Sequence, residues 1–183
     1  MQQNYPKDLT DYYRSHPETF ELRSDKTKKT LNIILLLIFL VILIYPEIIP
    51  FGELWILRII AGIGMVYAGV KAFLLDSDFW NKQTNSKITS LAIKKFSSSS
   101  TNEEEIRNLL ENNDFQRLAN IPSAENQPLQ LYIHEDKDGK SFYLLLMKYY
   151  SKSEFSGASA VKVVSGADYI QYKEIMKMNI NLI

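Results

Sequence analysis

The sequence predicts a membrane α-helical hairpin of two transmembrane helices joined to a small cytoplasmic α+β domain. Three observations predict it: two long apolar runs between residues 31 and 75, basic residues outside these runs but not between them, and alternating apolar residues beyond residue 128. A chain of 183 residues can hold a membrane anchor and one small domain. We expect a cytoplasmic segment at 1–30, the hairpin at 31–75, an amphipathic and serine-rich linker at 76–100, and the α+β domain at 101–183.

The first apolar run reads LNIILLLIFLVILIY, and Asn32 is its only clearly polar residue. A helix of a soluble protein needs a polar side, and this run has none. Its fifteen residues rise about 22 Å, less than a hydrocarbon core of roughly 30 Å, so flanking residues must complete the span. A cleaved signal peptide fits poorly, because no small-residue cleavage pattern follows. A buried hairpin of a soluble protein is the alternative.

The second run, from Leu54 to Leu75, carries one basic residue near each end. Arg58 and Lys71 lie four residues inside the ends, about 6 Å of helix rise, from where long side chains reach the headgroups. Tryptophans near both ends match the aromatic belts of membrane proteins. The predicted anchoring residues are Trp55, Arg58, Lys71 and Trp80.

Arg58 also has two other interpretations. A charge within a membrane span can belong to an ion or substrate path, although such a charge would sit nearer the middle of the helix. Its guanidinium could instead hold Glu53, Glu47 or a partner's carboxylate.

The basic residues predict the orientation of the hairpin. Nine of them flank the two runs, whereas the connecting loop from Pro46 to Glu53 has none and carries two glutamates. By the positive-inside rule, both termini should be cytoplasmic and the loop should lie outside the inner membrane. The nine are Arg14, Arg23, Lys26, Lys28, Lys29, Lys82, Lys87, Lys94 and Lys95.

Small residues form a ridge on the second helix. Gly64, Ala68 and Ala72 recur at a spacing of four, so they share one face. Small residues let helix backbones approach closely in lipid. The ridge is expected to pack against the first helix, with a homo-oligomer or partner contact as the alternative.

The cytoplasmic domain begins with a predicted helix. Thr101 and Glu104 have the spacing of a capping box, and the helix should end before Pro122. Before it, SLAIKKF fits either a strand or a segment lying on the membrane, and Ser97 to Ser100 reads as a spacer.

The sheet is expected to have three to five strands, mainly antiparallel. LQLYIHE alternates as a half-buried strand does, and SFYLLLMKYY is apolar on both faces, as a central strand is. Ala160 to Val164 should be a third strand, and Thr19 to Arg23 alternates well enough to be another. Tyr143, Tyr149 and Tyr150 share one strand, which usually means sheet packing, though surface tyrosines also serve protein contacts.

No residue pattern predicts a catalytic site, a cofactor or a metal. The chain has no cysteine, and its 21 basic and 21 acidic residues give none of the basic excess that nucleic acids select. His134, Glu135, Asp136 and Asp138 cluster, but they lack the further oxygen ligands of a calcium loop. Asp138 and Gly139 suit a hairpin turn instead.

The function predicted from these features is non-enzymatic. The cytoplasmic domain is expected to bind a protein partner as a subunit or adaptor of a membrane assembly, for which a toxin-neutralising immunity protein is one possible form. The lipid bilayer and a protein partner or second copy are the expected partners. The alternatives are an oligomeric transport or channel component, which would need polar residues at mid-membrane, and an enzyme at the membrane surface.

Overall fold

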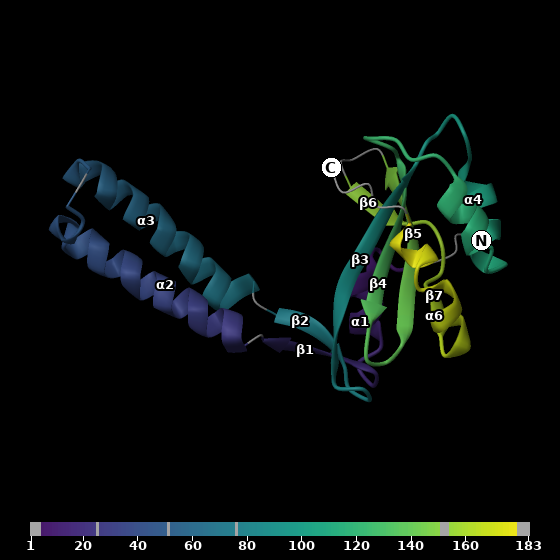
Figure 1. Cartoon of the computed structure of the whole chain (residues 1–183), viewed down its shortest axis with the longest axis horizontal. Coiled ribbons are helices and arrows are strands. Elements are labelled where there is room, and N and C mark those ends of the chain that lie inside the picture. Colours follow the sequence, from purple (N-terminus) through teal and green to yellow (C-terminus); the bar gives the residue numbers. More distant parts are fainter. Residues whose placement is uncertain (1–4, 25, 51, 76, 151–153, 179–183) are drawn as a thin grey trace. The chain divides into compact units, whose positions relative to one another are not determined.

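The computed structural model describes residues 5–24, 26–50, 52–75, 77–150 and 154–178. The chain divides into two compact units (Figure 1). The hairpin unit is Leu22–Asp78, and the folded unit combines Met1–Glu21 with Phe79–Ile183. The hairpin unit is therefore inserted into the sequence of the folded unit. The folded unit takes its first residues from before the hairpin and the rest from after it.

The hairpin unit consists of two apolar helices. Helix α2 spans Lys26–Ile44 and helix α3 spans Leu54–Val70, with a 3-10 turn at Pro46–Ile48 between them and a π-helical turn at Lys71–Leu75 after them. By length and composition, both are long and apolar enough to cross a membrane. The expectation of two such helices is confirmed. Helix α2 begins at Lys26, five residues before the apolar run, so the residues from Lys26 to Thr30 are also helical.

The seven strands of the chain pair in one antiparallel sheet in the order β1-β2-β3-β4-β5-β6, with β7 also paired to β5. The predicted count of three to five strands is wrong. Residues 77–96, expected mostly as linker, form β2 and β3, so the strand alternative for SLAIKKF is the one observed. The strands are β1 (Phe20–Ser24), β2 (Ser77–Asn81), β3 (Ser86–Phe96), β4 (Leu129–Asp136), β5 (Ser141–Tyr150), β6 (Glu154–Gly157) and β7 (Lys162–Ser165).

Helices cover both faces of this sheet (Figure 1). On one face, α4 (Glu103–Glu111), α5 (Phe115–Asn120) and α6 (Ala167–Tyr172) pack against the larger core. On the other face, α1 (Leu9–Ser15) packs with Phe20 against Tyr143, Leu145 and Met147 of β5. Strand β5 is buried from Ser141 to Met147, as expected for a central strand that is apolar on both faces.

The predicted helix from Thr101 is two helices in the structure. Asn102, not Thr101, caps α4: its side-chain oxygen accepts a hydrogen bond of 2.9 Å from the backbone N–H of Glu105. Asn113 then adopts a φ of 59°, which ends α4, and Asp114 caps α5 by accepting from the N–H of Arg117 at 3.1 Å. The chain still ends this helical region before Pro122, as predicted.

The segment before α1 joins the sheet at its β6 edge. Gly157 donates its backbone N–H to the carbonyl oxygen of Lys7 at 2.9 Å. A Cβ atom at Gly157 would lie 2.1 Å from the carbonyl oxygen of Pro6, so only glycine allows this approach. Residues 5–21 are therefore part of the folded unit and not a free segment ahead of the hairpin.

This arrangement predicts that the folded unit survives removal of the hairpin. Replacing residues 25–76 with Asn-Gly would join β1 directly to its neighbour β2 through a two-residue turn. We expect this variant to be water-soluble and to unfold cooperatively in a urea titration followed by circular dichroism. A fragment that starts at Thr101 should not unfold cooperatively, because it lacks α1 and the whole of β3. Equal behaviour of the two proteins would contradict this assignment of the core.

Candidate functional site

A cavity opens on the α1 face of the sheet, beyond the part that α1 covers. Met147 in β5 is buried at 2 % exposure, whereas Tyr149, two residues on and on the same face, is 45 % exposed. The cavity has a volume of about 270 Å³. We call it the sheet-end cavity; it is lined by Lys95, Asn126, Gln127, Pro128, Gln130, Tyr149 and Phe155.

The sheet-end cavity combines two aromatic rings with carboxamides and one cation. The rings of Tyr149 and Phe155, on the paired strands β5 and β6, are 5.4 Å apart at 59°. Gln130 donates to the carbonyl of Gln127 at 3.2 Å, which holds the cavity wall in place. Lys95 is the only charged residue among the described lining residues. Exposed aromatic rings beside neutral polar groups are typical of protein contact sites.

Asp136, from the acidic cluster, is buried and serves the fold. Its carboxylate accepts hydrogen bonds from Asn81 Nδ2 at 2.8 Å, from the hydroxyls of Thr84 and Ser86, and from the backbone N–H of Gly139 at 2.8 Å. It therefore ties the β2-β3 turn to the β4-β5 turn. A Cβ atom at residue 139 would lie 2.3 Å from Asp136 Oδ2, which explains the glycine in that turn.

The other members of the acidic cluster do not converge with Asp136. Glu135 accepts a hydrogen bond of 2.6 Å from the Tyr169 hydroxyl, and alternation along β4 places it on the opposite face from His134. Within the described ranges, no three histidine, cysteine or acidic side chains are grouped so that they could hold a metal ion.

His134 fastens α1 to the sheet. Its Nδ1 atom hydrogen-bonds with the hydroxyl of Tyr13 at 3.1 Å, among the rings of Phe20, Phe79 and Tyr143. Burial lowers the pKa of His134 to about 4, although the charge of Asp8 opposes this shift. Burial raises the pKa of Tyr143 to about 12. Both side chains are thus neutral near pH 7.

The lowered pKa of His134 makes stability depend on pH. A histidine with a pKa near 6.5 when unfolded and about 4 when folded contributes its full stability above pH 6.5 and loses it as the pH falls toward 4. We expect a loss on the order of 3 kcal/mol over this range. His134→Gln should flatten this pH dependence in urea unfolding of the detergent-solubilised chain. His16→Gln, at the chain's other histidine, is the control, and an unchanged slope in His134→Gln would contradict the assignment.

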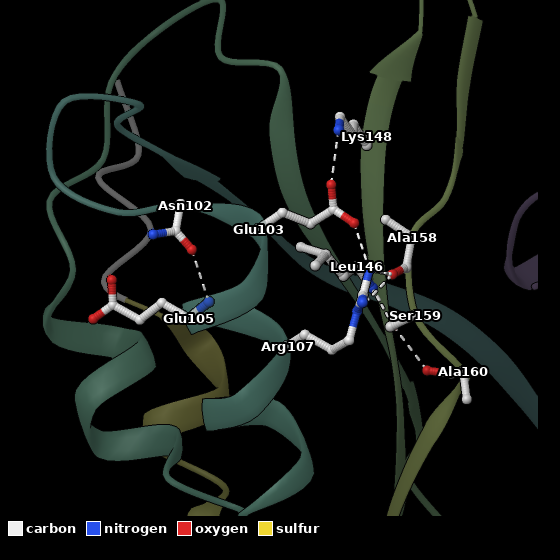
Figure 2. Close-up of polar contacts among 9 residues, drawn as sticks. All are labelled: Asn102, Glu103, Glu105, Arg107, Leu146, Lys148, Ala158, Ser159 and Ala160. Carbon is white, nitrogen blue, oxygen red and sulfur yellow. Dashed lines mark hydrogen bonds and ion pairs between the residues drawn. The ribbon is translucent and has the colours of Figure 1, made fainter. Parts of the chain in front are cut away.

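A charged clamp joins α4 to the sheet on the other face (Figure 2). Arg107 donates from Nε and Nη2 to the carbonyl oxygen of Ala158 at 3.1 and 2.9 Å and also pairs with Glu103. Lys148 Nζ contacts the other oxygen of Glu103 at 2.8 Å, and this hydrogen bond raises the pKa of Lys148. Both cations share the carboxylate of Glu103, so the clamp holds α4 in place against the sheet.

The predicted anchoring residues lie in both units. Trp55 is 61 % exposed and donates its indole N–H to Glu53. Arg58 is exposed and forms no ion pair with any residue that the structure describes. Lys71 begins the π-helical turn, with its ammonium 5.8 Å from the ring centre of Tyr67. Trp80 instead belongs to the folded unit, where it lies half-buried in β2 opposite Lys87.

The predicted ridge of small residues is buried within the hairpin unit. Ala68 and Ala72 are at most 3 % exposed, and a Cβ atom at Gly64 would lie 2.5 Å from the ring of Phe39 on α2. Ala61, which the sequence analysis did not select, extends the ridge at 1 % exposure. The ridge thus lies against α2, the first of the two predicted arrangements.

Most residues of the sheet-end cavity were not predicted, because they come from separate stretches of sequence. Tyr149 alone carried a signal, as one of the tyrosines singled out in its strand. No family model, curated protein or solved structure matches this chain.

Proposed function

We propose that this chain is a two-pass integral membrane protein whose folded unit binds a protein partner on the cytoplasmic side. The observation that carries the proposal is the uncovered apolar surface of the hairpin. No side chain of helix α2 is fully buried. In the hairpin unit, Leu31, Ile63 and Phe73 are 64, 68 and 67 % exposed. Soluble monomers rarely expose continuous apolar surface of this extent, whereas a bilayer would cover it.

The fold supports an even number of crossings independently of charge. Residues 5–21 and 79–178 form one compact unit, so both must lie on the same side of any membrane that α2 and α3 cross. The nine basic flanking residues, against none in the loop, favour the cytoplasm as that side.

The sheet-end cavity supports a protein partner. Its aromatic rings give contact area with few rotatable bonds, and its carboxamides offer hydrogen bonds to a peptide backbone. The carboxylates of the buried Asp136 and the half-buried Glu103, elsewhere in the folded unit, are occupied by internal contacts. We therefore assign partner binding, as a subunit or adaptor of a membrane assembly, to the face that carries this cavity.

Cysteine labelling tests the membrane topology. Because the chain has no cysteine, single cysteines can be introduced without background. Pro50 in the loop is preferable to Gly52, whose φ of +97° disfavours any other residue. Pro50→Cys should react with an impermeant maleimide in intact cells, and Ser98→Cys only after permeabilisation. The reverse pattern would reject the orientation, and two unlabelled cysteines in intact cells would reject the crossing.

Two neighbouring tyrosines provide a matched test of the binding face. Tyr149 and Tyr150 are 45 and 46 % exposed but point to opposite faces of β5. After purification in mild detergent, a stoichiometric partner identified by mass spectrometry should be lost from Tyr149→Ala and kept by Tyr150→Ala. A partner kept by both variants, or lost from Tyr150→Ala alone, would show that the sheet-end cavity is not the binding face.

A further inference from the structure

Four lysines gather at one end of the hairpin unit. Lys26, Lys28 and Lys29 lie in the first turn of α2, and Lys71 follows the last residue of α3. The two helices run side by side in opposite directions, so these positions share one end (Figure 1). The ammonium of Lys29 lies 6.0 Å from the ring centre of Phe73, a contact that joins the two helices. We call this group the basic end.

Internal contacts leave most of this charge unbalanced. Lys28 approaches Asp78 at 3.8 Å, but its side chain remains 54 % exposed. Lys26, Lys29 and Lys71 have no carboxylate within ion-pair distance among the described residues. Arg23 and the four lysines carry five positive charges, and Asp25, Asp76 and Asp78, which are close to them in sequence, carry three negative charges, so the net charge is +2. The opposite end, with Glu47, Glu53 and Arg58, carries −1.

The lysines of the basic end do not stabilise α2. The N-terminus of a helix carries partial positive charge, so cations in the first turn are unfavourable and acidic residues are preferred. The first turn of α2 has three lysines and no acidic residue. An anion outside the chain would offset this departure from helix preference.

We infer that the basic end binds anionic phospholipid headgroups in preference to zwitterionic ones. This inference rests on the proposed membrane insertion. The lysine stems would lie along the apolar helices and the rings of Tyr67 and Phe73, with their ammonium groups at the depth of the lipid phosphates. Clusters of basic residues at the cytoplasmic end of a membrane helix attract anionic lipids, with about a fivefold preference for each lysine close to the surface.

Electron paramagnetic resonance of spin-labelled lipids tests this inference. The full chain is reconstituted in phosphatidylcholine vesicles that contain a trace of spin-labelled phosphatidylglycerol or phosphatidylcholine, and the motionally restricted fraction of each is measured. We expect phosphatidylglycerol to be restricted several-fold more strongly, and the preference to shrink in 0.5 M salt, at roughly a 4 Å screening length. Replacing Lys26, Lys28, Lys29 and Lys71 with glutamine should bring the ratio close to one.

Two further variants make the result specific. Replacing Lys137, Lys140, Lys173 and Lys177 with glutamine removes the same charge from the folded unit and should keep the preference. Arginine at the four positions of the basic end should also keep the preference for phosphatidylglycerol, because it retains the positive charge. This variant therefore separates loss of charge from misfolding. Equal restriction of both lipids by the native chain, or an equal loss in the folded-unit variant, would overturn the inference. Absence of any restricted lipid would overturn the proposed membrane insertion as well.

Discussion

The uncovered apolar surface of α2 and α3 is the constraint on which the rest of this structure depends. The two helices contact each other along the ridge of Ala61, Gly64, Ala68 and Ala72, where small side chains allow close approach. That ridge covers one face of α3 and leaves the other faces of both helices uncovered. Association through small residues is the arrangement that lipid favours, because apolar surface there has no tendency to collapse on itself. Water would instead drive the same helices to bury their remaining faces.

The folded unit joins parts of the chain that lie on either side of the hairpin in sequence. Tyr13 reaches His134 across 121 positions of sequence, and the N-terminal segment closes the face of the sheet that α4 and α5 do not cover. Contacts this distant in sequence form slowly. A hairpin of two helices returns β2 beside β1, so the N-terminal segment can join a sheet whose other strands are made later.

Sequence reasoning succeeded where one physical pattern dominated. The continuous apolar runs predicted the two long helices. Period-two alternation predicted β4, a run that is apolar on both faces predicted β5, and Asp138 with Gly139 predicted the turn between them. It failed where local and distant effects compete. Residues 77–96 mix lysines with apolar residues, and only pairing of β3 with β4 over Ile88 to Phe96 decides that they form strands. Asp136 looked like part of a charged turn, and its burial depends on Asn81 and Ser86, about fifty residues away. The sheet-end cavity exists only once these distant strands are paired.

The central claim is that lipid covers the hairpin, and alkaline carbonate extraction tests it most directly. Membranes from cells that express the full chain are washed at pH 11, which releases peripheral proteins and leaves integral proteins in the pellet. The uncovered apolar side chains of α2 and α3 predict that the chain stays in the pellet and is solubilised only by detergent. Complete release into the carbonate supernatant would contradict membrane insertion and would mean that protein, not lipid, covers these helices.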